Sequence, residues 1–241
     1  MVTADEIRRN LDAVRENLAA AAAVSGRKPD EIALMGVTKF QPAESILAAF
    51  ERGLGLFGEN RIQERESKSA ALAGIQAEWH MIGTLQRNKA RRALAMFDCI
   101  QSVGDITLAE TLERIIGENP EETGFATPYP VMVEVNVSGE YTKQGVAPEK
   151  CFALIDGIAV KCPRVEIRGL MTIGPLTDDE HKMRDSFRTL RELREEAKKR
   201  FDFSMRHLSM GMSADYAAAI MEGSTMIRVG TAIFGARDKR L

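Results

Sequence analysis

Short apolar runs alternate with longer amphipathic stretches along most of this chain. Each run is rich in β-branched or other apolar residues, ends near Gly, Asn or Ser, and is followed by residues with helical spacing. Because apolar runs buried on both faces are typical of parallel strands joined by helices, the pattern predicts an α/β fold, a (β/α)8 TIM barrel. The eight runs are residues 31–39, 54–60, 78–83, 98–104, 131–138, 165–174, 206–211 and 224–230.

A doubly wound sheet is the alternative for the same alternation. It is disfavoured because no Gly-x-Gly-x-x-Gly turn follows the first run and because eight units would make a very wide open sheet. No linker or low-complexity tract divides the chain, and the polar stretch 117–130 is typical of a surface loop. The sequence therefore predicts one domain covering residues 1–241.

The first 26 residues predict an additional helix that packs on the barrel. Thr3 and Glu6 form a capping-box pattern, and Gly26 follows the last residue with helical spacing. The predicted buried face of this amphipathic helix consists of Ile7, Leu11, Val14 and Leu18.

Composition excludes several classes of protein. The 241 residues include 44% hydrophobic and 28% charged residues, no long apolar run, and a formal net charge of −2. This balance gives no general attraction to nucleic acid or anionic lipid, and nothing in it predicts a membrane protein. The cysteines, Cys99, Cys151 and Cys162, lack metal-ligand spacing, and the N-terminus lacks the apolar segment of a signal peptide. We expect a cytoplasmic protein with reduced thiols and no metal site.

Candidate chemistry begins with Lys39, which follows the apolar run "EIALMGVT". Active sites of this fold lie at the C-terminal ends of the strands, where a partly desolvated lysine can form a Schiff base with an aldehyde or ketone. The alternative is a lysine that reaches solvent and pairs with Glu59. The same rim should carry Asn60, His80, Asn136, Met210, Gly211, Arg228 and Gly230.

Two short glycine-containing turns follow the last two predicted strands. One leads from Gly211 to Ser213, and the other from Gly230 to Thr231. Each turn alone is most simply an ordinary helix cap. Together, at the rim position where barrels of this kind commonly bind phosphate, they predict a phosphorylated carbonyl ligand for Lys39.

The chain resembles the pyridoxal 5′-phosphate homeostasis protein family from about residue 30 to residue 237. The resemblance implies the fold type III barrel, related to the N-terminal domain of alanine racemase. It also implies pyridoxal 5′-phosphate held as a Schiff base on Lys39. The segments that carry the resemblance are "GVTKF", "LFGENRIQE", "WHMIGTLQRNK", "VEVNVSGEYTKQG", "IRGLMTIG", "LSMGMSADYAAAI" and "GSTMIRVGTAIFGAR".

The resemblance also assigns the other cofactor contacts. Ser213, Gly230 and Thr231 match the phosphate contacts of the family, and Arg228 matches the arginine that faces the pyridine nitrogen. "VTKF" departs from the family's commoner "VSKT" or "VSKK", so the resemblance assigns no contact to the residue after the lysine.

Arg228 bears on whether the protein is an enzyme. A guanidinium cannot accept a proton, so it disfavours a protonated ring nitrogen and makes the cofactor a weaker electron sink. Racemases of this fold work with such an arginine, but by resemblance they add a second domain and a tyrosine base from a partner subunit. The chain ends after the eighth unit, and none of Tyr129, Tyr141 and Tyr216 has an evident base role.

The sequence therefore predicts a monomeric carrier of pyridoxal phosphate without catalytic turnover, which contacts enzymes lacking the cofactor only transiently. A small racemase-like enzyme is the runner-up, and a cofactor-free Schiff-base aldolase is the third hypothesis. Lys143 is a competing loop lysine for a secondary aldimine. The basic segment 86–92 lacks interleaved aromatic residues and is interpreted as a solvated helix face rather than a nucleic-acid site.

Overall fold

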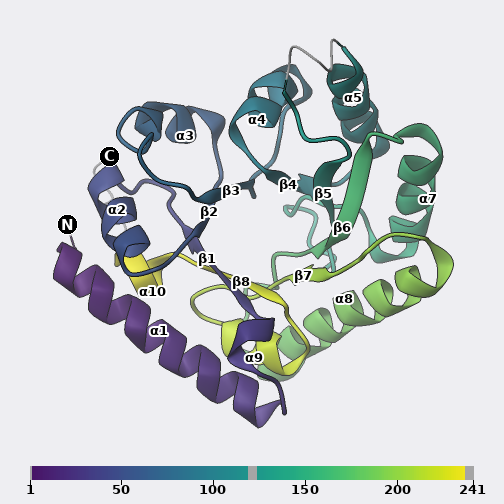
Figure 1. The fold of residues 1–241 in the computed structure, drawn as a ribbon. Helices are drawn as coiled ribbons and strands as arrows, with labels where there is room; N and C mark the ends of the chain where they lie inside the picture. Colours follow the sequence, from purple (N-terminus) through teal and green to yellow (C-terminus); the bar gives the residue numbers. More distant parts are fainter. Residues whose placement is uncertain (1, 119–123, 237–241) are drawn as a thin grey trace.

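The computed structural model describes residues 2–118 and 124–236, and in these ranges eight parallel strands close into a barrel (Figure 1). Consecutive strands are neighbours, and β8 pairs with β1 to complete the ring. The predicted (β/α)8 fold is confirmed. The strands are β1 (Ala33–Val37), β2 (Leu56–Glu59), β3 (Glu78–Met81), β4 (Cys99–Val103), β5 (Tyr129–Glu134), β6 (Val165–Met171), β7 (His207–Ser209) and β8 (Met226–Val229).

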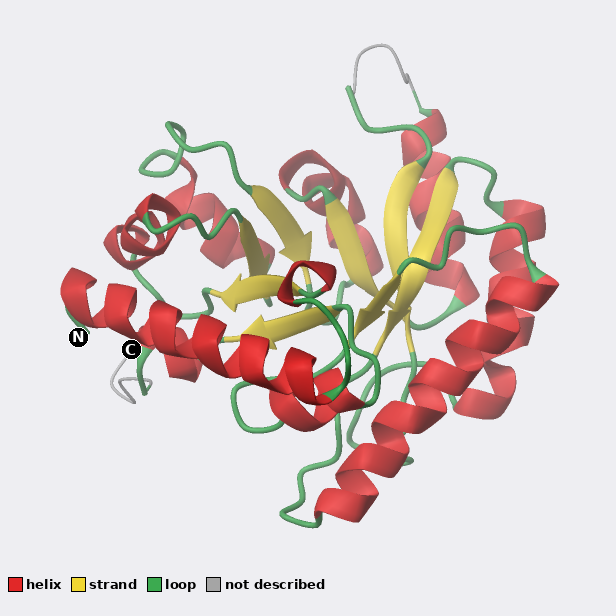
Figure 2. Cartoon of the chain, turned by 60° about the horizontal axis from the view of Figure 1, so that its bottom comes forward, coloured by secondary structure: helices red, strands yellow, loops and turns green. Residues whose placement is uncertain are grey.

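Helices form the outer layer around the barrel (Figure 2). Three short 3-10 turns, η1 (Pro29–Glu31), η2 (Arg87–Lys89) and η3 (Pro148–Lys150), join elements within the described residues. The α-helices described are α1 (Ala4–Val24), α2 (Ala43–Glu51), α3 (Ile62–Ser69), α4 (Ala90–Met96), α5 (Ile106–Gly117), α7 (Cys151–Lys161), α8 (Glu180–Arg200), α9 (Tyr216–Met221) and α10 (Thr231–Phe234).

The predicted and observed boundaries differ at several elements, including β5 and α9. Strand β5 begins at Tyr129, two residues before the predicted run, while residues 119–123 of the predicted loop lie outside the described residues. Helix α9 begins at Tyr216 rather than at Ser213, because the Asp215 side chain accepts the backbone N–H of Met212 and closes a turn first. Ser213 therefore lies in that turn.

Helix α1 is the additional N-terminal helix, and it lies along α2, α9 and α10 (Figure 1). Its capping box is formed: the Thr3 N–H donates to Glu6 Oε2 over 2.7 Å, and the Glu6 N–H donates to Thr3 Oγ1 over 3.2 Å. The predicted apolar face is buried, together with Ala22. This face makes α1 part of the main hydrophobic core.

The barrel interior has an apolar layer and a polar layer. The apolar layer is a separate small cluster that includes Met35, Ile82, Cys99, Met132, Met171 and Met226. Unbranched methionine side chains fill such an irregular space well. The polar layer contains the buried side chains His80, Gln101, Ser209 and Arg228, which are joined by hydrogen bonds.

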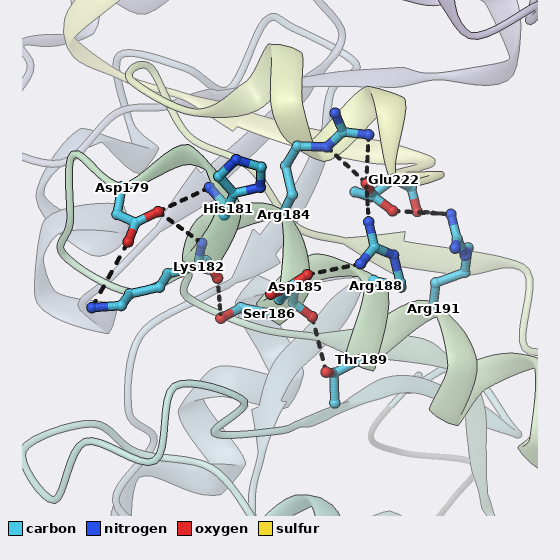
Figure 3. A network of polar contacts seen from close by, with 10 residues as sticks. All are labelled: Asp179, His181, Lys182, Arg184, Asp185, Ser186, Arg188, Thr189, Arg191 and Glu222. Carbon is cyan, nitrogen blue, oxygen red and sulfur yellow. Dashed lines mark hydrogen bonds and ion pairs between the residues drawn. The ribbon is translucent and has the colours of Figure 1, made fainter.

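Helices α8 and α9 are joined by an ion cluster around Glu222, the residue that follows α9 (Figure 3). Its side chain is 3% exposed and accepts hydrogen bonds from Arg184, Arg188 and Arg191 of α8 over 2.8–3.2 Å. A buried carboxylate with several charge-assisted partners is held firmly. The cluster therefore fixes the end of α9, the helix that follows the Ser213 turn.

Candidate functional site

Lys39 lies just beyond the C-terminal end of β1, at the barrel mouth, and is partly buried. Its Nζ lies 5.0 Å from the centre of the Phe40 ring. No carboxylate within the described residues lies within 4.0 Å of this amine. Phe40 has a φ of 61°, and its N–H donates to Glu64 over 2.7 Å, which turns the chain away after the lysine.

The alternative that pairs Lys39 with Glu59 is wrong. Glu59 is fully buried, and its Oε1 accepts hydrogen bonds from Lys68 Nζ and Thr38 Oγ1, each over 2.7 Å. Burial raises the pKa of Glu59, and the neighbouring Lys68 ammonium opposes this rise. Glu59 is therefore occupied by a lysine of α3.

Two cavities meet at Lys39. The larger, of about 680 Å³, lies toward β2 and β3. Its lining includes Asn60, Arg61 and Lys89, so it is a polar cavity with a positive wall. The smaller, of about 30 Å³, lies on the other side of the lysine and is lined by Val37, Gln41, Gly230, Thr231 and Gly235 as well as Lys39. Lys39 thus lines both cavities, one with Asn60 and the other with Gly230 and Thr231.

The two turns predicted to hold phosphate are joined by Ser213. Its Oγ accepts the backbone N–H groups of Gly230 over 3.2 Å and of Ala232 over 3.3 Å. These bonds use the lone pairs of the hydroxyl and leave its proton free to be donated to an anion. Thr231 is exposed beside this contact.

Gly211 and Met210 have structural roles in the same segment. Gly211 has a φ of 94°, and a Cβ there would lie 2.6 Å from the Ala219 Cβ, so glycine is required. The Met210 side chain is fully buried in the outer core, its N–H donates to Met226, and its carbonyl accepts from Ser224. We therefore leave Met210 out of the proposed contacts.

Arg228 extends from β8 into the barrel and is 4% exposed. Its Nη1 donates to Ser209 Oγ over 2.8 Å, and its Nη2 donates to the Thr172 carbonyl over 2.7 Å. Burial lowers the pKa of Arg228 to about 10, so the guanidinium stays cationic at neutral pH. Burial raises the pKa of Glu134 on β5 to about 7, and the charge of Arg228 opposes this rise.

Sequence reasoning placed His80 at the rim, and this placement is wrong. The His80 ring is buried inside the barrel, where it contacts Gln101 Nε2 over 2.6 Å and Glu78 Oε1 over 2.7 Å. Gln101, Ser209 and Glu134 were missed altogether. Each of the three is a polar residue within an apolar strand run, and this is the feature of the sequence that could have indicated a hydrogen-bond partner inside the barrel.

The loop after β5 holds the remaining candidates. Lys143 Nζ donates to Glu140 Oε1 and to the Gly174 carbonyl, both over 2.7 Å, so it is a fixed ammonium. Asn136 Nδ2 donates to the Glu140 carbonyl over 2.9 Å and is used within the same loop. Tyr141 is fully exposed.

The basic segment 86–92 forms η2 and the start of α4 rather than one continuous helix. Arg91 pairs with Glu118 and Arg92 with Glu66, so both are ion-paired surface residues. None of the helices in the described ranges is long and apolar enough to cross a bilayer.

Comparison with known proteins first defines the class of barrel. Residues 9–238 match the family model described as alanine racemase, N-terminal domain. The chain also superposes on alanine racemase from Corynebacterium glutamicum with a TM-score of 0.68 at 18% identity, over 96% of this chain and 63% of that one. At this identity the superposition shows a shared fold.

The particular family follows from closer relatives. The pyridoxal phosphate homeostasis protein of Aquifex aeolicus is 38% identical over 94% of this chain and 96% of its own length. The protein of the same name from Escherichia coli K12 is 37% identical over 97% and 98%. This chain belongs to the family of pyridoxal phosphate homeostasis proteins.

A solved structure at similar identity was determined with a ligand. PipY of Synechococcus elongatus with pyridoxal phosphate bound is 35% identical, with a TM-score of 0.74 over 90% of this chain and 100% of that one.

Proposed function

We propose that this chain binds pyridoxal 5′-phosphate covalently through Lys39 and serves as an intracellular carrier and buffer of the cofactor. The observation that carries the proposal is the environment of Lys39, an amine at the barrel mouth without a carboxylate partner in the described residues. An amine that is not held in an ion pair is available to attack an aldehyde. The bound form of PipY supports the same ligand.

The surrounding residues fit the parts of this cofactor. Ser213 presents a free hydroxyl proton on the Gly230 side of Lys39, where a phosphate would accept it. Arg228 lies deeper in the barrel, bonded only through its two terminal nitrogens in the described residues, so other N–H donors remain for the ring nitrogen. Bound pyridoxal phosphate would supply the aldehyde that Lys39 holds.

The residues around the proposed position of the cofactor ring support a carrier that has no catalytic turnover. Arg228 cannot accept a proton, and Lys143 Nζ is held by Glu140 and by the Gly174 carbonyl. An acid-base catalyst has to lie within hydrogen-bond reach of the substrate proton. A polar cavity of about 680 Å³ next to Lys39 gives an incoming amine a route to the bound aldehyde carbon.

One observation favours the racemase-like alternative. Glu134 is buried near Arg228, and its pKa of about 7 suits a group that exchanges protons at neutral pH. Its charge partner is the same arginine that faces the proposed ring position. The alternative therefore assigns catalysis to Glu134 rather than to a tyrosine.

Two measurements test the proposal together. Titration with pyridoxal phosphate should produce a visible absorbance band that saturates at one equivalent, and Lys39→Ala should lack this band. Incubation of the loaded protein with each proteinogenic amino acid in deuterated water should give no multiple-turnover exchange at the α-carbon. Exchange that disappears in both Lys39→Ala and Glu134→Gln would instead establish the enzyme, and failure to bind the cofactor at all would end the carrier proposal.

A further inference from the structure

A chain of hydrogen bonds crosses the barrel interior from Arg228 on β8 to Glu78 on β3. Arg228 donates to Ser209 Oγ over 2.8 Å, and Ser209 Oγ donates to Gln101 Oε1 over 2.6 Å. Gln101 Nε2 contacts His80 Nδ1 over 2.6 Å, and His80 Nε2 contacts Glu78 Oε1 over 2.7 Å. Its members come from strands β8, β7, β4 and β3.

For a His80 ring that carries one proton, the direction of every bond in this chain follows from its two ends. The Glu78 carboxylate can only accept, and the hydrogen bond from His80 lowers the pKa of Glu78, so His80 carries its proton on Nε2. Its Nδ1 is then an acceptor, which requires the amide N–H of Gln101. The Gln101 oxygen therefore faces Ser209, whose hydroxyl donates to it and accepts from Arg228.

Because most of these side chains are buried, breaking or reversing one of the hydrogen bonds costs free energy. Gln101 and Ser209 are fully buried, and His80 is 2% exposed, so water cannot replace a lost partner. Bonds that all donate the same way polarise one another, and here they run from a cation to an anion. Glu78 is the one member with an exposed side chain, 55%, at the N-terminal end of β3, beside a cavity of about 630 Å³.

We propose that Ser209, Gln101 and His80 are positioning residues, which hold the Arg228 guanidinium in one orientation toward the cofactor ring through this chain anchored at Glu78. The proposal rests on the proposed function, because the ligand of Arg228 is taken to be the ring nitrogen. Ser209 supplies the side-chain acceptor of Arg228, and the other members fix the rotamer and proton of Ser209. Nothing in the reaction of Lys39 itself requires these residues.

The first test uses the protein without cofactor. A long-range ¹H–¹⁵N spectrum of the imidazole rings should show His80 as the neutral Nε2–H tautomer, and the sequence has only three histidines to assign. In Gln101→Leu the Nδ1 resonance of His80 should move, because its donor is gone. A His80 that carries its proton on Nδ1 would overturn the proposal, whatever the protein binds.

The second test measures the effect on the cofactor. Ser209→Ala and Gln101→Leu should lower the affinity for pyridoxal phosphate about tenfold and shift the visible band of the bound cofactor, because Arg228 loses its fixed partner. Ser204→Ala is the matched control, because it removes a buried hydroxyl that has no partner within the described residues.

The outcomes separate this proposal from the proposed function. If the wild type forms no visible band, the proposed function fails, while the histidine spectrum still decides whether the chain of bonds exists. If the wild type binds and the Ser209→Ala band and affinity match those of Ser204→Ala, Ser209 does not position Arg228 and the proposal is overturned.

Discussion

Lys39 and Lys68 are both close to the peptide group between Thr38 and Lys39, but their amines have different partners. Lys68 Nζ donates to the Thr38 carbonyl over 2.9 Å and to Glu59 over 2.7 Å, and its side chain is 10% exposed. Lys39, the residue after Thr38, has an aromatic ring near its amine and no carboxylate within 4.0 Å in the described residues.

The difference separates a lysine held within the fold from one whose amine is available at the barrel mouth. The Lys68 ammonium is engaged by a carboxylate and a carbonyl oxygen, so it is not free to attack a ligand. Lys68 also fixes the backbone from which Lys39 extends. We infer that Lys68 neutralises Glu59 and thereby keeps this carboxylate from pairing with Lys39.

Removing the paired lysine should have the largest effect. Lys68→Met leaves Glu59 buried without its partner and should lower the free energy of unfolding by about 3–5 kcal/mol. Lys39→Met, the matched control, breaks no ion pair and should change it by less than about 0.5 kcal/mol. Urea denaturation of both variants measures this difference, and equal losses would show that the two environments are energetically alike.

The second prediction concerns Glu134, a buried carboxylate that, unlike Glu59, has no lysine partner within the described residues. Burial raises the pKa of Glu134 from 4.5 to about 7, so the folded state binds this proton more tightly than the unfolded state. Protonation of Glu134 therefore contributes on the order of 3 kcal/mol to the free energy of unfolding. This contribution is fully present below pH 4.5 and is lost as the pH rises through 7. Unfolding free energies measured from pH 4.5 to 8 should show this decline, and Glu134→Gln should largely remove it. A decline of the same size in the variant would assign it to another group.

The third prediction concerns binding at the unpaired lysine. Lys39→Ala should weaken pyridoxal phosphate binding by about two orders of magnitude, roughly 2.7 kcal/mol, because only the noncovalent contacts remain. Lys143→Ala, which removes a lysine already held by Glu140, should change the affinity less than about twofold. Fluorescence titration of both variants gives the two constants. A larger loss in Lys143→Ala would move the site to the β5 loop.

The smallest effect is expected at the phosphate end. Ser213→Ala removes a charge-assisted hydrogen bond of roughly 1.5–3 kcal/mol, which corresponds to about tenfold or more in affinity. Pyridoxal, which lacks the phosphate, should bind wild type and variant alike, and Thr231→Ala should cost less than Ser213→Ala. Titrations with both ligands test this. Equal losses for pyridoxal and its phosphate would show that Ser213 supports the fold rather than the phosphate.

The sequence predicted those features that depend on local periodicity. Apolar runs and helical spacing predicted the barrel, and because all strands of such a barrel end at one rim, Lys39 could be assigned to the barrel mouth. Arg228 was placed on the same rim, but like His80 it lies buried inside the barrel. The capping box at Thr3 was predictable for the same reason, since it needs only residues three positions apart.

Contacts between distant residues could not be predicted in this way. The partner of Glu59 is decided by the orientation of α3, which places Lys68 over the end of β1. The chain through Gln101 and Ser209 depends on which residues of four strands share one level inside the barrel. A polar residue in an apolar strand indicates that it has a hydrogen-bond partner inside the protein. The register of the strands decides which residue that partner is.

We propose that Lys39, which has no carboxylate partner among the described residues, takes the cofactor rather than the held Lys143 or Lys68. The most direct measurement adds one equivalent of pyridoxal phosphate to the wild-type protein, reduces it with borohydride, and locates the modified lysine by peptide mapping. The reduced cofactor should be found on the peptide that contains Lys39. Modification mainly at Lys143 or Lys68 would contradict it.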